Sequence, residues 1–318
     1  MTKSVTAVVR CLNEVDHIER LVTGMRAQSV PVDELIFVDS GSTDGTLELI
    51  ERFGDIVVHI ERSEFSFGRS LNRGISAASG DLVLVCSAHV YPSHDDWVEQ
   101  LRNAFDDDTV AYAYGRQIGD HRTKFSEERV MRSWFPPTSI DRQPHPFANN
   151  ANSMLRRDVW ATHGFDETLT GLEDVAWASY VQSQGYAVSY RANAPVYHVH
   201  EEDWTTVRNR YRREAIAYKR IFPDSGMTVG RAGVLFGSSV IMDSLAAVRN
   251  QRRVSPSDIV MFRANQFFGA WKGFADDMPD AELLSRFYYP RRTGVKADTL
   301  NGRILNYDEL DIMKVGTL

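Results

Sequence analysis

Short apolar runs alternate with helically patterned segments along the first part of the chain. The runs are rich in β-branched residues and lie between turn residues, which is typical of buried strands in a parallel sheet. They cover Val5–Arg10, Glu34–Asp39, Ile56–Ile60 and Leu82–Cys86. Between them, apolar residues three and four positions apart predict helices over His17–Ala27, Thr46–Phe53 and Phe67–Ser79. This alternation predicts an α/β fold with a mostly parallel sheet and right-handed crossovers.

The pattern becomes less regular after this point. The further elements that it predicts are helices over Trp97–Phe105, Asp158–His163 and Glu173–Gln184, and strands over Val110–Gln117, Ala151–Arg156, Ala187–Tyr190 and Val196–His198. Between Gly119 and Phe147 the periodicity is lost and four prolines occur. We expect a long irregular loop there, and loops of that length in compact domains are often functional.

The character of the sequence changes near residue 204. Helices are predicted over Thr205–Arg220, Val229–Asn250 and Pro256–Phe274. We therefore expect two units, a catalytic or binding domain over residues 1–204 and a helical C-terminal extension over residues 205–318. The extension is a candidate for acceptor, membrane-surface or oligomer contacts.

Composition narrows the class of protein. The chain has 318 residues, 43% of them apolar and 25% charged, which is typical of a globular protein. Its net charge of −7 argues against a nucleic-acid partner. Two cysteines and the absence of a leader-like N-terminus favour a cytoplasmic location. We expect no membrane span, because the longest apolar segment, Ala232–Val248, is interrupted by Asp243 and falls short of the roughly 20 residues required.

Polar residues follow three of the predicted strands directly. They are Arg10–Glu14, Asp39–Asp44 and Ser87–His89, and Arg69 begins a helix nearby. Carboxyl ends of parallel strands meet at one edge of a sheet, where ligands bind. The alternative for the second cluster is a turn capped by Asp44 or Thr43. Cys11 and Cys86 end the first and fourth strands, and we expect these strands to be neighbours.

The sequence resembles the family 2 glycosyltransferases, which have the GT-A fold, and most of all those that build bacterial surface polysaccharides. The matching segments are Val8–Glu14, Val38–Thr46, Gly68–Gly74, Ala77–Val85, Gly171–Asp174 and Val196–His200. The resemblance implies a GT-A, Rossmann-like sheet flanked by helices. It also implies inverting transfer of a sugar from a nucleotide diphosphate, with a UDP-sugar favoured, to a hydroxyl of a glycan or a polyprenol-linked glycan.

The resemblance also implies a donor site. Asp39 would hold the base, with Glu14 and the backbone of Arg10, Cys11 and Leu12 beside it. Arg69 would lie near the base and the phosphates. Ser87 and Ala88 stand, with His89, where the family has an Asp-x-Asp motif. His89 would then be a ligand of a divalent metal, Mn²⁺ more readily than Mg²⁺, or a hydrogen-bond donor to the diphosphate.

The remaining implied residues belong to the acceptor side and the metal. Glu173 and Asp174 match the family's acidic pair, and Asp174 is preferred as the general base; the alternative is helix capping. His198 and His200 lie two apart on an extended segment and so face opposite ways. His200 is preferred as the metal ligand. Asn150, within Asn149–Asn152, would line the sugar pocket, or would only form a turn.

Several features keep more than one interpretation. Trp134, Trp177 and Trp204 suit sugar stacking or burial. Arginines and lysines between Arg208 and Arg220 suit anionic lipid headgroups and peripheral attachment to the inner membrane face, or a face packed on the catalytic domain. Aromatic runs such as Phe287–Tyr289 suit a core or a homo-oligomer interface. Two other functions remain open: a nucleotidyltransferase, which the loop Leu12–Asp16 disfavours because it lacks glycines, and a non-catalytic nucleotide- or glycan-binding relative.

Overall fold

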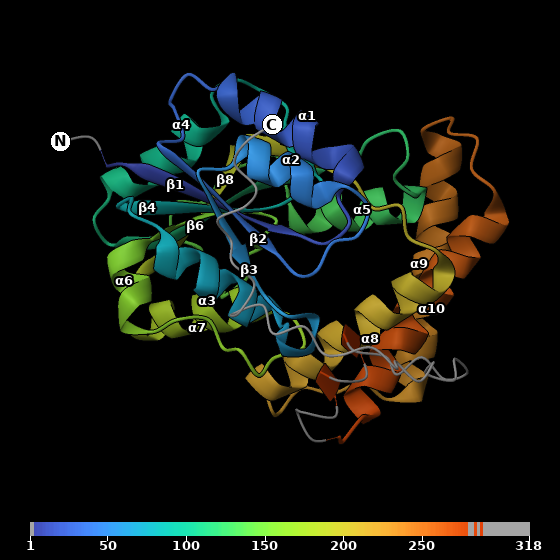
Figure 1. Cartoon of the computed structure of the whole chain (residues 1–318). Coiled ribbons are helices and arrows are strands. Elements are labelled where there is room, and N and C mark those ends of the chain that lie inside the picture. Colours follow the sequence, from blue (N-terminus) through green and yellow to red (C-terminus); the bar gives the residue numbers. More distant parts are fainter. Residues whose placement is uncertain (1–2, 279–282, 285–286, 289–318) are drawn as a thin grey trace, which may run out of the picture.

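An eight-stranded sheet forms the centre of the N-terminal part of the molecule, with helices on both of its faces (Figure 1). The computed structural model describes residues 3–278, 283–284 and 287–288. The strands lie across the sheet in the order β3-β2-β1-β4-β7-β6-β8-β5. Their bounds are β1 Val5–Cys11, β2 Glu34–Asp39, β3 Ile56–His59, β4 Leu82–Ser87, β5 Val90–Pro92, β6 Val110–Ile118, β7 Asn152–Arg156 and β8 Ala187–His198.

The strand directions bring distant segments to one edge of the sheet. Strands β1 to β4 run parallel to one another, β7 runs antiparallel to both β4 and β6, and β8 is parallel to β6. Hence β1, β2, β4, β6 and β8 all end at the same edge, and the segment before β7 lies there too. We call this the carboxyl edge. The prediction of a mostly parallel sheet is confirmed.

The helices cover both faces and continue beyond the sheet. Their bounds are α1 Val15–Arg26, α2 Thr46–Phe53, α3 Phe67–Ala77, α4 Trp97–Arg102, α5 Phe125–Trp134, α6 Arg157–Thr162, α7 Glu173–Ser183, α8 Trp204–Ile221, α9 Val229–Arg249 and α10 Pro256–Ala275. Short 3₁₀ turns occupy Arg62–Glu64 and Asn103–Asp106. Every helix that the periodicity predicted is present within a few residues of its expected bounds.

Alternating residues of the strands separate two apolar cores. In β1, Val5, Ala7 and Val9 pack on one face of the sheet, and Val8 packs on the other. Val9 pairs with Cys86, so β1 and β4 are neighbours as predicted. Both cysteines are buried free thiols. Burial raises the pKa of Cys86 to about 12, which leaves the thiol protonated and unreactive.

Three expectations are wrong. The segment 119–147 is not wholly irregular, because it contains α5; four of the ten residues of that helix are charged, so its apolar periodicity is weak. The two predicted strands near residues 187–198 form one strand, β8, interrupted by a bulge between Arg191 and Val196. Finally, the expected shortfall in length is wrong, because α9 is 21 residues long and is apolar enough to cross a membrane by length and composition; the expectation of no membrane span itself stays a prediction.

The C-terminal helices gather on one side of the sheet, beyond α5 (Figure 1). Helix α10 packs closely on α8 at two glycines. A Cβ at Gly269 would lie 2.4 Å from the carbonyl oxygen of Arg208, and a Cβ at Gly273 would lie 2.2 Å from that of Arg212. Only glycine permits this approach.

The basic side chains of α8 are engaged by acids of the protein. Arg210 pairs with Glu127 and Glu202, and Arg212 pairs with Asp276. Lys219 lies 3.8 Å from Asp277. These contacts favour the packed-face interpretation of the basic helix over lipid contact. The division near residue 204 stays a prediction.

Candidate active site

The loops that follow β1 and β2 are joined by hydrogen bonds. Asn13, at a positive φ of 56°, accepts at Oδ1 from the backbone N–H of Thr43 at 2.8 Å. Its own N–H donates to Ser42 Oγ at 2.9 Å. Asp44 accepts at Oδ2 from the N–H of Val15 at 3.2 Å. The two polar clusters expected at adjacent strand ends therefore form one rigid rim.

Asp39 lies at the base of this rim, with 4% of its surface exposed. Its Oδ2 accepts from the N–H groups of Gly41 at 2.9 Å and Ser42 at 3.2 Å. Gly41 has φ 91°, a conformation that favours glycine. Asp44 accepts from the N–H of Thr46 at 3.0 Å, but the N-cap of α2 is Gly45, so the expectation that Asp44 or Thr43 is the N-cap is wrong. Binding of a base by Asp39 stays a prediction.

The side chain of Arg69, in α3, is held by hydrogen bonds to residues outside this helix. Its Nε donates to Glu167 Oε2 at 2.8 Å, and its Nη1 donates to the carbonyl of Glu64 at 2.7 Å. Asn72, one turn further on, donates to Glu167 Oε1 at 2.9 Å. These bonds fasten α3 to the segment before α7. Two nitrogens of Arg69 therefore already donate within the protein, and its contact with a donor's phosphates stays a prediction.

Three histidines converge at the carboxyl edge. His89 follows β4, His198 ends β8, and His200 lies two residues beyond. Each offers a ring nitrogen within 4.8 Å of the others. The rings of His89 and His198 stack with centroids 5.1 Å apart, and the Nε2 atoms of His198 and His200 are 2.9 Å apart. We call this set the histidine cluster.

A fixed acceptor faces the Nδ1 atom of each ring. His89 contacts Glu14 Oε1 at 2.8 Å, His198 contacts Gln117 Oε1 at 2.7 Å, and His200 contacts Glu127 Oε1 at 2.8 Å. A proton on each Nδ1 satisfies these three contacts and turns the Nε2 atoms toward one another; when no cation is bound, the 2.9 Å contact between the Nε2 atoms of His198 and His200 requires a proton on one of the two. Carboxylate or amide acceptors behind imidazoles are the usual outer shell of a metal site.

Electrostatics favour a neutral imidazole at His198. Burial, then His200 and His89, hold the pKa of His198 well below its usual value. Although burial alone would raise it, the hydrogen bond from His200 and the charge of Arg210 hold the pKa of Glu127 below its usual value. The donor set therefore fits a divalent cation that accepts nitrogen ligands, such as Mn²⁺, and fits Mg²⁺ less well.

The expectation that His198 and His200 face opposite ways is wrong. It assumed a strand that continues through both residues, whereas β8 ends at His198. The N–H of Val199 donates to the carbonyl of His89 at 3.2 Å, which turns the chain and brings both rings to one side. His198, set aside as structural, thus belongs to the cluster. Gln117 and Glu127 were missed, and the helix that carries Glu127 was not predicted.

The acidic pair begins α7 and faces the segment before β7. The N–H of Asn150 donates to Asp174 Oδ2 at 3.0 Å, and its Nδ2 donates to Glu173 Oε1 at 3.2 Å. The hydroxyl of Tyr112 donates to Asn150 Oδ1 at 2.6 Å, which fixes the amide. Leu172, at φ 57°, turns the chain into the helix. Asn150 lies in a turn closed by the N–H of Asn152 on the carbonyl of Asn149 at 3.2 Å, so the expected turn is present, and within it Asn150 contacts both carboxyl groups.

Asp174 has a strongly perturbed acidity. Its burial, followed by the charge of Glu173, raises its pKa to about 8. Its Oδ1 also accepts from the N–H of Val175 at 2.8 Å, but the N-cap of α7 is Leu172 and no side chain caps the helix, so the capping alternative is wrong. A carboxyl group that titrates near neutral pH is suited to general base catalysis.

Arg10 extends from the end of β1 toward the same carboxyl groups. Its Nη1 lies 3.8 Å from Glu173 Oε1, and its guanidinium lies over the ring of Phe67 at 4.5 Å. Its Nε and Nη1 are buried and have no hydrogen-bond partner among the described residues. The sequence suggested only the backbone of Arg10, so this side chain is a second feature that was missed.

One hydrogen-bonded path joins the histidine cluster to the carboxyl pair. Gln117, which holds His198, donates from Nε2 to Asn149 Oδ1 at 2.8 Å. Asn149 precedes Asn150, which holds Asp174. Glu14 joins His89 to the β1 rim at the other end. Most of the predicted residues therefore lie along one edge, while Ser87 and the buried Ala88 form the turn that leads to His89.

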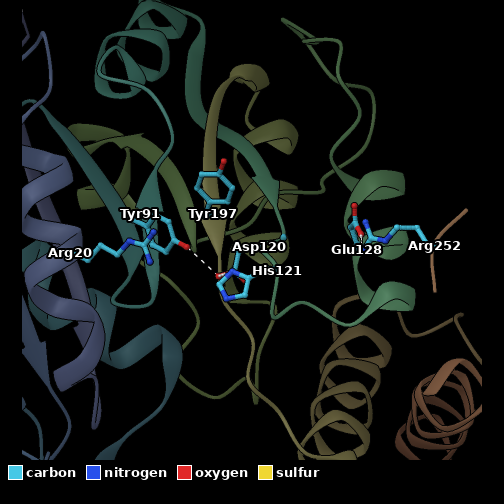
Figure 2. A pocket seen from close by; sticks show the side chains of 8 residues that line it. Arg20, Tyr91, Asp120, His121, Glu128, Tyr197 and Arg252 are labelled. Atoms are coloured by element: carbon cyan, nitrogen blue, oxygen red, sulfur yellow. Dashed lines mark hydrogen bonds and ion pairs between the residues drawn. The ribbon is translucent and has the colours of Figure 1, made fainter. Parts of the chain in front are cut away.

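A cavity of about 520 Å³ opens beside β5 and β8 (Figure 2). Arg20 and Tyr91 lie on one side of it, and Glu128 and Arg252 on the other. Tyr91 pairs with Tyr197 across the two strands, whereas His198 pairs with Val90 one position on. Consecutive residues project to opposite faces, so this cavity lies on the other face from His198. We do not assign the transfer chemistry to it.

The three tryptophans lie in different environments. Trp177 is buried and donates to the carbonyl of His163 at 2.7 Å. Lys124 lies over the ring of Trp204 at 5.4 Å. Trp134 is 52% exposed and stacks on Phe147 at 4.6 Å, so it alone of the three presents a face to solvent.

Known proteins resemble the chain in sequence and in fold. The O-antigen chain rhamnosyltransferase WbaN of Salmonella anatum is 27% identical over 57% of this chain and 60% of WbaN. The succinoglycan biosynthesis protein ExoA of Rhizobium meliloti is 26% identical over 57% of this chain and 58% of its own length. The chain thus spans about three fifths of these relatives.

Solved structures show the same fold at low identity. The mannosyltransferase PcManGT of Pyrobaculum calidifontis, in complex with GDP-Man and Mn²⁺, superposes with a TM-score of 0.62 at 17% identity, over 87% of this chain and 89% of that one. TarS of S. aureus in complex with UDP-GlcNAc gives 0.52 at 16% identity, over 83% and 90%. The model of the family described as "Glycosyl transferase family 2" matches residues 6–164. The chain belongs to glycosyl transferase family 2 and has the GT-A fold.

Proposed function

We propose that this protein transfers a sugar, with inversion, from a nucleotide diphosphate to a hydroxyl of a glycan or lipid-linked glycan during bacterial polysaccharide synthesis. The observation that carries the proposal is the single edge on which the β1–β2 rim, the histidine cluster and the buried carboxyl pair are joined by hydrogen bonds. The relatives named for O-antigen and succinoglycan synthesis support the polysaccharide context.

The rim and the cluster would hold the donor. Asp39, Glu14 and the β1 exit lie where a base and ribose would bind beyond parallel strands. His89, His198 and His200 would hold a divalent cation through their Nε2 atoms. Such a cation, when bound, neutralises charge on the diphosphate leaving group. The Mn²⁺ in the mannosyltransferase structure supports a cation in this fold.

The carboxyl pair would act on the acceptor. Asp174 takes the proton of the acceptor hydroxyl while that oxygen bonds to the anomeric carbon from the face opposite the leaving group. The bond from this carbon to the phosphate oxygen breaks, and the nucleoside diphosphate leaves with the bonding electrons. Asn150 orients Asp174, and Arg10 donates from its unpartnered nitrogens to substrate oxygens. Inversion follows because one displacement occurs.

A donor panel tests the proposal. The metal-depleted protein is incubated with UDP-, GDP- and dTDP-sugars, with and without Mn²⁺ or Mg²⁺, and released nucleoside diphosphate is measured. We expect release from one class of donor, UDP-sugars first, and a stronger response to Mn²⁺ than to Mg²⁺. Asp174→Asn should keep binding and lose release. Binding without release in the wild-type protein, with a supplied acceptor, would instead favour a non-catalytic binding protein.

A further inference from the structure

Helix α9 turns an apolar face to solvent. Val234, Ile241, Leu245 and Val248 are 72%, 61%, 66% and 78% exposed, and Met242 is 61% exposed. Their spacing of three, four and seven places them on one side of the helix. Isolated exposed apolar residues are normal, but a stripe along a whole helix marks a contact surface.

The opposite side of α9 is fixed to the rest of the protein. Asp243 is 1% exposed and contacts Arg129 of α5 at 2.6 Å and Arg263 of α10 at 2.8 Å. Carrying α9 across a bilayer would pull this carboxylate away from both arginines, which is costly for buried ion pairs. The helix therefore keeps its place in the fold, and its apolar side faces outward.

Helix α10 extends the same kind of surface. Val260, Met261 and Phe268 are exposed to 40% or more. The ring of Trp271 lies 5.7 Å from that of Phe268, and the Lys272 ammonium lies 4.9 Å from the Trp271 ring. Tryptophan beside lysine at the margin of apolar residues is typical of segments placed at a membrane–water interface.

The charge of this hairpin has the opposite sign to that of the chain. Residues 229–275 contain six basic and two acidic residues, against a net charge of −7 for the whole chain. One of the two acids is the buried Asp243, which leaves Asp258 as the acid on the surface. Arg231, Arg249 and Arg253 are exposed near the ends of α9. A second copy docked on this face by a two-fold axis would oppose like charges, whereas anionic headgroups would complement them.

We propose that the α9–α10 face docks on the surface of an anionic membrane. The apolar stripe enters the boundary between headgroups and acyl chains, and Arg231, Arg249, Arg253 and Lys272 contact the phosphates. This surface is separate from the basic helix α8, in which Arg210 and Arg212 are paired with acids of the protein. The proposal does not depend on the transfer reaction, since it concerns binding alone.

Vesicle flotation of the full chain tests this docking. Vesicles of phosphatidylcholine with about a third phosphatidylglycerol are compared with pure phosphatidylcholine, and we expect at least tenfold tighter binding to the anionic vesicles. Leu245→Glu should weaken that binding about tenfold or more, and Leu245→Ser by several-fold. Arg249→Gln with Arg253→Gln should weaken it mainly at low salt.

Matched controls separate docking from charge and folding. Gln184→Glu adds the same charge on the exposed end of α7 and should change binding less than twofold. A thermal melt checks that Leu245→Glu is folded, as its 66% exposure implies. Equal flotation of wild-type protein and Leu245→Glu would overturn the proposal. So would a vesicle-free dimer that Leu245→Glu converts to monomers, since the occupant would then be a second copy.

Discussion

The carboxyl edge and the α9–α10 face depart from an ordinary protein surface in opposite ways. At the edge, polar and ionisable groups such as Asp174 and His198 are buried and held by fixed partners. On α9, large apolar groups such as Leu245 are exposed without a partner. Burying polar groups and exposing apolar ones are both costly in an isolated protein. Each therefore points to something outside the chain: a polar substrate at the edge and an apolar surface at α9.

The largest effect is expected from Asp174→Asn. Loss of a general base typically costs between 10² and 10⁴ in rate, and we expect about 10³ in kcat with donor affinity unchanged. Glu173→Gln is the matched variant, because Glu173 adjoins Asp174 and also accepts a hydrogen bond from Asn150. Stopped assays of nucleoside diphosphate release measure both. If Glu173→Gln lost more turnover than Asp174→Asn, the roles of the two acids would have to be exchanged.

The histidine cluster should show the next largest effect. His198→Ala removes a nitrogen ligand and should weaken Mn²⁺-dependent donor binding about 100-fold, because the two remaining rings hold the ion less well. Gln117→Ala leaves the ring but frees its orientation, and we expect a loss between about 10- and 100-fold. Titration calorimetry with Mn²⁺ and with donor separates the two steps. Unchanged Mn²⁺ affinity in His198→Ala would remove this histidine from the proposed cation site.

The carboxyl pair and the histidine cluster differ in how much of their arrangement could be predicted from the sequence. Asp39 and His89 could be placed at one edge because parallel strands end together and polar residues follow them, whereas Asp174 was implied only by the resemblance to the family's acidic pair. The position of His198 depended on where β8 ends and on the contact of Val199 with His89, which no period-two pattern contains. Tertiary packing decided the conformation there, so the pattern failed at a candidate functional residue.

The same limit applies to partners that lie far apart in sequence. Arg69 was placed near the phosphates from its position at a helix start, but Glu167, 98 residues later, pairs with it. The basic stretch of α8 suggested a lipid surface, and acids from other elements pair with its arginines instead. In α9 the charged residues are Arg231, Asp243 and Arg249, and the sequence alone could not show that Asp243 is fixed against Arg129 and Arg263.

A pH profile sharpens the assignment at the edge. A base works when deprotonated, and burial raises the pKa of Asp174 to about 8. We therefore expect kcat/KM to rise about tenfold per pH unit between pH 6 and 8 and to level off above. Glu173→Gln removes a neighbouring negative charge that favours the protonated form, so its profile should shift to lower pH. A flat wild-type profile from pH 6 to 9 would contradict a base with this acidity.

The smallest effect is expected from Leu245→Ala, which tests whether the α9 face is exposed to water in solution. Leu245 is 66% exposed and Leu101 is fully buried, so truncating each to alanine compares the two environments directly. We expect Leu101→Ala to lower the free energy of unfolding by about 2–5 kcal/mol, because it leaves a cavity in the core. Leu245→Ala should change it by less than about 0.5 kcal/mol, as surface substitutions usually do. Urea denaturation without lipid measures both. A loss above about 2 kcal/mol for Leu245→Ala would mean that the face is already covered within the protein, because only buried methyl groups destabilise by that amount when removed.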